Sequence, residues 1–573
     1  MTPGIHLPRR PLVIGAVVAL GLALGSGPAV AHHGDGGLDG ITQIVVIYEE
    51  NHSFDNLFGG WEGVNGIHRA LGSGHVIQRA ADGTPLPCLP QNEVNLASPP
   101  LPVTCHGSVG TIPVDSAFRN RPFVIDDFIK PTDKTCPAPG VFAPHGVLKD
   151  SPGALPGGCT ADLVHRYYQE QYQIHGGRMD RFVTGSDAIG LVMGRYDTRA
   201  LPIYRYLHSP GAPHYAIADR FFQAAFGGSF LNHQWLVAAA TPTWPGAVAD
   251  GSANDLHSIV GADGHPNSYP LHPATGVKDG ALTQAANPDG SCKVPAGAPT
   301  PPPGTVCGDF AVNTIQPAFQ PFAPGTPATR QLPPQTAPTI GDRLSAKSVD
   351  WAWYSGGWDN AAGNVGGPGW TNGTTPGTCT DPQHNPASVY PNCPDKLFQY
   401  HHQPFNYFAN YAPGTPGRAH LRDEVEFIAA AKSGRLKPVS FVKPIGAENE
   451  HPGYASEHSG SSHLVDLIKA IRSGPQARST AIVVTYDEFG GQWDHVSPPT
   501  RSGVSDRFGP GTRIPTLIIS PKLRARFAVD SASHDTTSIL ATIEHRYGLA
   551  PLSTRDAAVR DLSRAITGRL GDW

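Results

Sequence analysis

The sequence lacks the features that would place it among nucleic-acid-binding or zinc-finger proteins. Its 573 residues carry 42 Lys+Arg against 47 Asp+Glu, a formal net charge of −5. So slight an imbalance gives no electrostatic case for binding nucleic acid or an anionic membrane. No C-x-x-C pair and no repeat of fixed period is present. Zinc is therefore a weak interpretation of the eight cysteines.

Long apolar runs are also missing beyond the amino-terminal segment 1–31, so no later stretch is long enough to span a membrane. That segment has the pattern of a signal peptide. Arg9 and Arg10 precede an apolar run over 12–25, and A-V-A at 29–31 is a cleavage sequence. A membrane-spanning helix is the alternative, but the run is short and rich in glycine. We expect an exported protein, periplasmic or extracellular, without a stable membrane anchor.

The cysteines form four near-neighbour pairs, each of which brackets a loop rich in proline and glycine. The pairs are Cys88 with Cys105, Cys136 with Cys159, Cys292 with Cys307, and Cys379 with Cys393. In an exported chain this spacing favours local disulfides, with Cα separations of roughly 4.4–6.8 Å. Adjacent pairing is the simplest connectivity, and other pairings stay open.

The 66 glycines and 58 prolines concentrate in insertions near 84–160, 241–336 and 360–396. No linker separates two self-contained patterns. After the signal peptide we therefore expect one catalytic domain over about 40–570, with these insertions as long loops stapled by disulfides.

Short β-branched apolar runs at 41–48, 439–442, 481–486 and 514–520 predict buried strands. Helical patterns occupy 421–432, 462–473 and 536–547, and Gly548 is a plausible stop for the last. The alternation of strands and helices predicts an α/β fold with a doubly wound, mostly parallel sheet. The middle of the chain is too irregular for a detailed assignment.

Acids and an amide follow directly after two of these strands. They are Glu50 and Asn51 after 41–48, and Asp487 and Glu488 after 481–486. Open α/β sheets bind ligands at the carboxyl ends of their strands, and oxygen ligands suit a hard divalent cation. The alternative is that these side chains cap helices or stay solvated.

Ser229 follows two glycines, so its hydroxyl would be accessible on a tight turn, and a base or a cation could activate it. A Gly-Gly-Ser segment alone is usually just a turn, and a G-x-S-x-G elbow is absent. The 26 histidines include several that could bind phosphoryl oxygens or donate a proton: His165, His401, His402, His451 and His495. Any one of them taken alone is more commonly a structural residue.

Two long blocks resemble a known family. The segment E-N-H-S-F-D-N-L-F-G at 50–59 resembles the E-N-R-S-F-D-x-x-F-G opening of the bacterial phosphoesterases. Residues 486–496, Y-D-E-F-G-G-Q-W-D-H-V, resemble the Y-D-E-x-G-G-x-x-D-H-V block of that family. The family comprises phospholipases C and a respiratory-burst-inhibiting acid phosphatase. The resemblance spans about 40–550, and the 241–336 insertion has no counterpart in it.

The resemblance implies a fold similar to alkaline phosphatases and sulfatases, with a metal-bound nucleophile. It implies one divalent ion held by Glu50, Asn51, Ser229, Asp487 and Glu488, with Ser229 as the nucleophile. It also implies substrate-binding side chains, namely Asn51, His165, His401 and His402 with His451; His495 is a further candidate. Either His402 or His451 would give a proton to the leaving oxygen.

The segment G-G-S-F-L-N-H around Ser229 is nearer the acid-phosphatase pattern than the G-P-T-x-P-N-R of the phospholipases. We therefore expect a secreted phosphomonoesterase that acts through a phosphoserine intermediate. A mildly acidic optimum is expected if the histidines must be cationic to bind phosphate. The alternatives are a phospholipase C acting on phospholipid head groups and a non-catalytic phosphate-binding protein. A sulfatase is disfavoured because C-x-P-x-R and S-x-P-x-R are absent.

Overall fold

A mostly parallel β-sheet forms the centre of this computed structural model. The structure describes residues 1, 37–73, 76–80, 82–91, 93–138, 140–143, 146–245, 310–380, 387–395 and 397–570. Within these residues the sheet has eight strands in the order β13-β12-β14-β1-β15-β16-β10-β17. Strand β16 runs antiparallel to both of its neighbours, and the other pairings are parallel. The predicted α/β class with a mostly parallel sheet is confirmed.

The strands of this sheet have the following bounds: β1 (Gln43–Glu49), β10 (Tyr215–Ala218), β12 (Trp351–Ser355), β13 (Leu421–Asp423), β14 (Val439–Lys443), β15 (Thr480–Tyr486), β16 (Thr516–Ile519) and β17 (Phe527–Asp530). Every residue of β1, β14 and β15 is buried. Burial on both faces explains their continuous apolar sequences, because helices cover a parallel sheet on each side. The four strands predicted from sequence correspond to β1, β14, β15 and β16.

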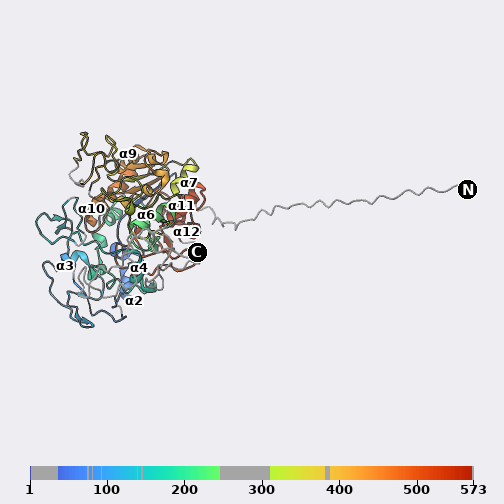
Figure 1. The fold of residues 1–573 in the computed structure, drawn as a ribbon. Coiled ribbons are helices and arrows are strands. Elements are labelled where there is room, and N and C mark those ends of the chain that lie inside the picture. Colours follow the sequence, from blue (N-terminus) through green and yellow to red (C-terminus); the bar gives the residue numbers. More distant parts are fainter. Residues whose placement is uncertain are drawn as a thin grey trace. The chain divides into compact units, whose positions relative to one another are not determined.

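Helices lie on both faces of the sheet. On one face α6 (Ser229–Ala238) packs against α11 (Thr537–Tyr547), and these are the green and red helices of Figure 1. Tyr48 of β1 points to this face, because its hydroxyl donates to Asn232 O at 3.4 Å. Glu49 points to the opposite face, where α10 (Glu457–Ser473) packs against α9 (Glu424–Ser433) and α5 (Pro202–His208).

The three predicted helices correspond to α9, α10 and α11, and α11 ends at Gly548 in the left-handed conformation, as expected. The starts of two helices differ from the prediction: α10 begins at Glu457 rather than at 462, and α9 begins at Glu424 rather than at 421. Residues 421–423 form β13 instead, and the Asp423 carboxylate then accepts a hydrogen bond from Val425 N at 3.2 Å. An aspartate at this position ends the strand and caps the helix, so the helical pattern begins three residues later.

The remaining longer helices are α2 (Ile67–Ser73), α4 (Tyr167–Ile174) and α7 (Ile340–Ala346). Short helices are α1 (Phe54–Leu57), α3 (Val94–Ala97), α8 (Trp358–Ala362), α12 (Thr554–Ala558) and α13 (Ser563–Thr567). Two-stranded pairs lie outside the main sheet: β2 (Cys88–Leu89) with β5 (Phe118–Arg119), β3 (Ser108–Val109) with β4 (Ile112–Pro113), β6 (Phe123–Val124) with β9 (Gly194–Arg195), β7 (Lys134–Cys136) with β8 (Leu155–Pro156), and β11 (Phe221–Phe222) with β18 (His534–Asp535). Among the described residues, no helix has both the length and the apolar character needed to cross a membrane.

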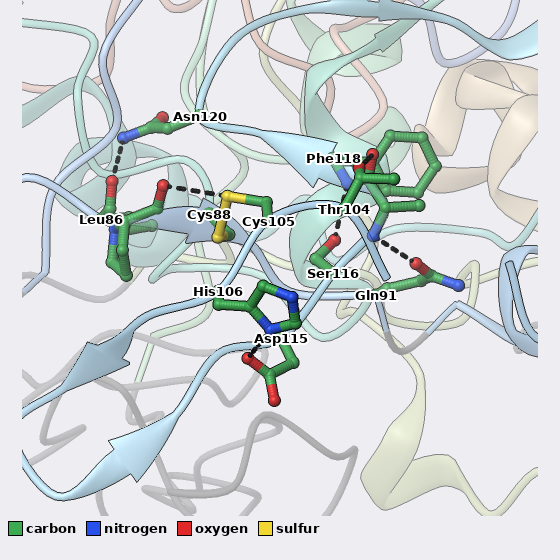
Figure 2. Close-up of a disulfide and its surroundings, with 12 residues drawn as sticks. Leu86, Cys88, Gln91, Thr104, Cys105, His106, Asp115, Ser116, Phe118 and Asn120 are labelled. Atoms are coloured by element: carbon green, nitrogen blue, oxygen red, sulfur yellow. Dashed lines mark hydrogen bonds and ion pairs between the residues drawn. A yellow bond between two sulfur atoms is a disulfide. The ribbon is translucent and has the colours of Figure 1, made fainter. Parts of the chain in front are cut away.

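Three of the four predicted disulfides are present. Cys88–Cys105, Cys136–Cys159 and Cys379–Cys393 have Cα separations of 5.9, 4.8 and 5.3 Å. Figure 2 shows the first of them, close to the bond from Asn120 Nδ2 to Leu86 O and to the contact between His106 and Asp115. The pair Cys292 and Cys307, residues 246–309 of the second insertion and the predicted signal peptide after Met1 lie outside the described residues.

Candidate metal and phosphate site

The predicted acids and amide converge at the carboxyl edge of the sheet. Glu50 and Asn51 follow β1, Asp487 and Glu488 follow β15, and the two strands are parallel neighbours. The Asn51 backbone N–H donates to Asp487 Oδ1 at 3.0 Å, which ties the two strand ends together. All four residues are fully buried. Strand pairing therefore brings together residues more than 430 positions apart in the sequence.

Ser229 places its hydroxyl among these oxygens. Its Oγ lies 3.0 Å from Glu50 Oε2, and 3.4 Å from both Asn51 Oδ1 and Glu488 Oε1. Ser229 is the first residue of α6, so its position is fixed by the helix start. A side chain at Gly228 would lie 2.9 Å from the ring of His165. Glycine before Ser229 therefore leaves room for a histidine beside the hydroxyl.

A second glycine, Gly490, is required by the loop that follows Asp487 and Glu488. Asn51 adopts a left-handed backbone conformation with φ 60°. A Cβ atom at Gly490 would lie 2.1 Å from Asn51 O, closer than any real contact. Gly490 itself has φ 60°, which favours glycine. The loop 487–491 can thus fold back against Asn51 only with glycine at 490.

Lys443 belongs to this cluster and was not predicted from the sequence. It is the last residue of β14, it is buried, and its Nζ pairs with Glu50 Oε1 and donates to Tyr48 O at 2.9 Å. The sequence contained a signal for this position, because Lys443 directly follows the predicted strand 439–442 and so lies at a strand end. Its neighbour β1 carries Glu50 at the same edge of the sheet.

His233 is the second residue that the sequence reasoning did not assign to the site. It lies one turn after Ser229 on α6, and its Nδ1 donates to Ser229 O at 2.8 Å. Its buried Nε2 has no hydrogen-bond partner in the described structure and lies 3.8 Å from Glu50 Oε1. His402 stacks on His233 at 5.0 Å between ring centroids, and its Nε2 lies 3.3 Å from Glu50 Oε1.

The other predicted pocket histidines surround the same cluster. His451 Nε2 lies 3.0 Å from Asn51 Nδ2, and His165 Nε2 lies 3.5 Å from Glu488 Oε1. These two rings are 6.3 Å apart. His401 contacts the ring of His402 at 4.5 Å. The structure therefore brings His165, His401, His402 and His451 together around the oxygen cluster.

The structure places His495 in a different set of interactions. Its Nδ1 bonds Asp55 Oδ2 at 2.5 Å, and its Nε2 lies 3.2 Å from Asn65 Oδ1. Arg513 binds the other oxygen of Asp55 at 3.1 Å and also bonds Asp494. His495 thus belongs to a buried ion-pair cluster. Among the described interactions, none joins it to Glu50, Asn51, Ser229, Asp487 or Glu488.

Burial controls the protonation of the pocket histidines. Desolvation lowers the pKa of His401 to about 3, and lowers the pKa of His233, His402 and His451 well below the usual value. These rings are therefore neutral in mildly acidic solution. The sequence-based expectation of a pocket made cationic by its histidines is not met in the free protein.

The carboxyl groups give this site excess negative charge once they are ionised. Burial, followed by the charge of Asp487, raises the pKa of Glu50 and of Glu488 well above the usual range. When Glu50, Asp487 and Glu488 are ionised, their three negative charges face the single positive charge of Lys443 and neutral histidines. Two negative charges remain, which matches the charge of a divalent cation.

The orientation of the Asn51 amide tests whether a cation fits. His451 Nδ1 lies 2.6 Å from Pro452 O, so it carries the proton of the neutral ring, and Nε2 must accept from the Asn51 amide. Asn51 Oδ1 then faces the carboxylate oxygens of Glu50 and Glu488. Rotating the amide would remove this clash but would require a doubly protonated His451, against its lowered pKa. A cation among these oxygens, or a proton on Glu50 or Glu488, resolves the conflict.

A further atom offers a position for a cation. Asp487 Oδ2 is buried and has no hydrogen-bond partner among the residues that the structure describes, whereas Glu50 Oε1 is paired with the Lys443 ammonium. Glu50, His233 and Asp487 also offer ligand atoms within 4.8 Å of one another. Oxygen atoms with an imidazole nitrogen form a donor set suited to a divalent metal.

The fold and site thus define an α/β protein with a serine hydroxyl inside a buried, oxygen-rich cluster at the carboxyl edge of the sheet. The chain belongs to the Phosphoesterase family, whose sequence profile matches residues 140–550.

Curated relatives of this chain carry phospholipase C names. It is 34% identical over 163 residues to phospholipase C B of Mycobacterium tuberculosis (strain CDC 1551 / Oshkosh), covering 24% of this chain and 31% of that protein. It is 30% identical over 199 residues to the non-hemolytic phospholipase C of Burkholderia pseudomallei, covering 29% and 28%. The matches span about a third of each relative's length. A putative sulfatase from Bacteroides thetaiotaomicron covers 66% of this chain and 71% of its own, at 11% identity and a TM-score of 0.27, too low to carry an argument.

Proposed function

We propose that this protein is a metal-dependent phosphoric ester hydrolase that cleaves phosphomonoesters through a phosphoserine intermediate. The observation that carries the proposal is the position of the Ser229 hydroxyl, within 3.4 Å of oxygens from Glu50, Asn51 and Glu488 at the start of a helix. Family membership and the names of the curated relatives support phosphate-ester hydrolysis.

One divalent cation, of unspecified identity, would be held by side chains at the two strand ends and α6: Glu50, Asn51, Ser229, Asp487 and Glu488, with His233 as an added donor. When bound, such an ion lowers the pKa of a hydroxyl and offsets charge on a phosphoryl group. These residues fit the ion because they combine excess negative charge with unpartnered buried donors.

The chain's own residues supply the remaining chemistry. Ser229 Oγ attacks phosphorus, its proton passing to Glu50 Oε2 at 3.0 Å, and the bond from phosphorus to the leaving oxygen breaks. The backbone N–H groups at the start of α6 face the anionic phosphoryl group and stabilise it. Water then hydrolyses the phosphoserine and regenerates Ser229.

His402 or His451 would protonate the leaving alkoxide. Both rings are neutral in the free site, so each must first gain a proton. A phosphate dianion beside a buried ring favours the charged form and raises its pKa. Proton uptake would therefore accompany substrate binding, and the acidic optimum would depend on the bound phosphate.

A phospholipase C is the second candidate, and the names of the relatives favour it. The chemistry at phosphorus would be the same, and the substrate would be a phospholipid head-group ester. Turnover of phosphatidylcholine micelles compared with p-nitrophenyl phosphate separates the two. The three disulfides support an exported protein, since such bonds persist in oxidising compartments.

The experiment that tests the proposal compares Ser229→Ala with Ser440→Ala. Both serines are buried, and Ser440 lies on β14 with a hydroxyl that has no partner in the described structure. Ser229→Ala should lower hydrolysis of p-nitrophenyl phosphate by several orders of magnitude, and Ser440→Ala should not. Intact-mass measurement after acid quench should find phosphoserine only where Ser229 is present. Near-normal turnover by Ser229→Ala would show that water attacks directly. Phosphate binding without any turnover by the wild type would identify a binding protein instead.

A further inference from the structure

Aromatic side chains lead from the candidate site to the protein surface. His451, which contacts Asn51, stacks on Tyr454 with ring centroids 4.4 Å apart. Phe142 packs against Tyr454 at 5.4 Å and lies 6.5 Å from the ring of His451. The outermost ring, Phe142, is 49% exposed, whereas Tyr454 is buried. Phe142 is thus an apolar group on the outer side of a histidine that borders the reacting atoms.

Phe142 lies beside backbone that is attached to the segment carrying His451. We call residues 136–159 the stapled loop, because the disulfide Cys136–Cys159 closes it. Ala143 N donates to Gly453 O at 2.8 Å, which attaches the loop to the segment carrying His451. A Cβ atom at Gly453 would lie 3.2 Å from Phe142 Cε2, so the ring packs directly on this backbone. These contacts hold the Phe142 ring against the backbone of Gly453.

The stapled loop carries an unusual amount of exposed apolar side chain. Val141 is 43% exposed beside Phe142, and Leu148 and Leu155 of the same loop are 46% and 40% exposed. Exposed apolar groups that gather near a reactive site commonly mark a ligand-binding surface. Phe142 continues the aromatic contacts from His451, and Val141 precedes it directly in the sequence.

We propose that Val141 and Phe142 form an apolar subsite for the alcohol part of the substrate, so that esters of aliphatic alcohols are preferred. The inference rests on the proposed function. The phosphoryl oxygens need the polar groups around Ser229, so the carbon chain must leave this cluster. A chain that leaves on the side of His451 meets Phe142, whose ring lies 6.5 Å from that of His451. Contact with Val141 and Phe142 would then remove part of the chain from water.

The first test measures kcat/KM for straight-chain alkyl phosphates, from methyl to octyl phosphate, as monomers in solution. Wild-type kcat/KM should rise about two- to fourfold for each methylene that reaches the subsite. Phe142→Ala should reduce the octyl-to-methyl ratio about tenfold or more, because most of the apolar contact is lost. The matched control is Leu71→Ala on α2, since Leu71 is also 49% exposed; its ratio should equal that of the wild type.

A wild-type protein that hydrolyses methyl and octyl phosphate equally well would overturn the subsite, as would an unchanged ratio in Phe142→Ala. The proposed function can fail separately, and a binding measurement then decides the subsite. Calorimetry on Ser229→Ala with alkylphosphonates should show affinity increasing with chain length, and the increase should disappear when Phe142→Ala is added. Affinity independent of chain length would reject the subsite whether or not the protein turns over phosphate esters.

The same chemistry could come from a free aliphatic ester or from a lipid. Turnover of octyl phosphate in solution and of dioleoyl phosphatidic acid in vesicles distinguishes these sources. With either substrate, Phe142→Ala should no longer turn over the long-chain ester faster than methyl phosphate. If the variant keeps this preference with both substrates, the inference is wrong.

Discussion

Lys443, the last residue of β14, and Glu50, directly after the neighbouring strand β1, form a buried ion pair. Lys443 Nζ contacts Glu50 Oε1, while the Ser229 hydroxyl donates to Glu50 Oε2. Glu50 is therefore shared between an internal cation and the candidate nucleophile. An unpaired buried carboxylate costs folding free energy, so the Lys443 ammonium stabilises the metal-free protein by pairing with Glu50.

Replacing Lys443 with methionine should separate these two roles. The metal-free variant should unfold with a free energy about 3–5 kcal/mol lower, because Glu50 loses its buried partner. A divalent ion should restore more stability to the variant than to the wild type, since the site then carries an additional net negative charge. Thermal unfolding with chelator and with added metal measures both effects. An equal metal-induced shift in the two proteins would contradict the placement of Lys443 beside the ion.

Asp487→Asn should weaken metal binding and leave the fold in place. Asp487 Oδ1 accepts bonds from Asn51 N and Glu488 N, and an asparagine oxygen can keep those bonds. The unpartnered Oδ2 becomes an amide nitrogen, which cannot bind a cation. Hydrolysis should fall sharply and return in part with excess divalent ion. The control is Asp466→Asn, whose carboxylate is 74% exposed on α10 and should have no effect on metal dependence.

His495→Gln tests a residue that the sequence places among the substrate-binding candidates. In the structure His495 bonds Asp55, which also pairs with Arg513. The variant should lower the free energy of unfolding by about 1–3 kcal/mol, because a buried charge-assisted hydrogen bond is weakened. KM should change little. Urea unfolding and steady-state kinetics on the same preparation measure the two effects. A large rise in KM with unchanged stability would show that His495 binds substrate.

The strand ends of the site could be predicted because each has a recognisable local sequence pattern. Residues 41–48 and 481–486 are β-branched runs followed at once by acids and amides. Parallel pairing then brings the acids together without further information. The helix α6 was not predicted, since Gly-Gly-Ser also fits a turn. Without that helix, the sequence gives no reason to place His233 one turn from Ser229.

Other elements depend on contacts that no local pattern reveals. Strand β12 (Trp351–Ser355) has aromatic residues but lacks the β-branched run that marked its neighbours. Phe142 and His451 are 309 positions apart, and their proximity depends on how the stapled loop docks on Gly453. The neutral state of the pocket histidines likewise follows from burial, which composition does not show. Sequence therefore predicted the convergence of the strand-end residues better than the surrounding walls and their electrostatics.

His463 on α10 should make the stability of the protein depend on pH. Its Nε2 lies 2.6 Å from Glu424 Oε1 and 3.6 Å from Glu448 Oε2. Burial alone would lower the pKa of His463, but the hydrogen bond and charge of Glu424, with Glu448 and Glu49, raise it to about 9. The unfolded chain has the ordinary histidine pKa of about 6.5. The folded state therefore binds this proton more tightly than the unfolded state.

Such a group stabilises the protein fully below the unfolded pKa, and its contribution is lost as pH rises through the folded pKa. The difference in free energy of unfolding between wild type and His463→Gln should be about 3 kcal/mol larger at about pH 6 than at about pH 10. Urea titrations of both proteins at the two pH values measure it. Subtracting the variant removes the contributions of titrating groups that are far from His463, because these are common to both proteins. A difference that does not change with pH would mean that His463 stays neutral between Glu424 and Glu448.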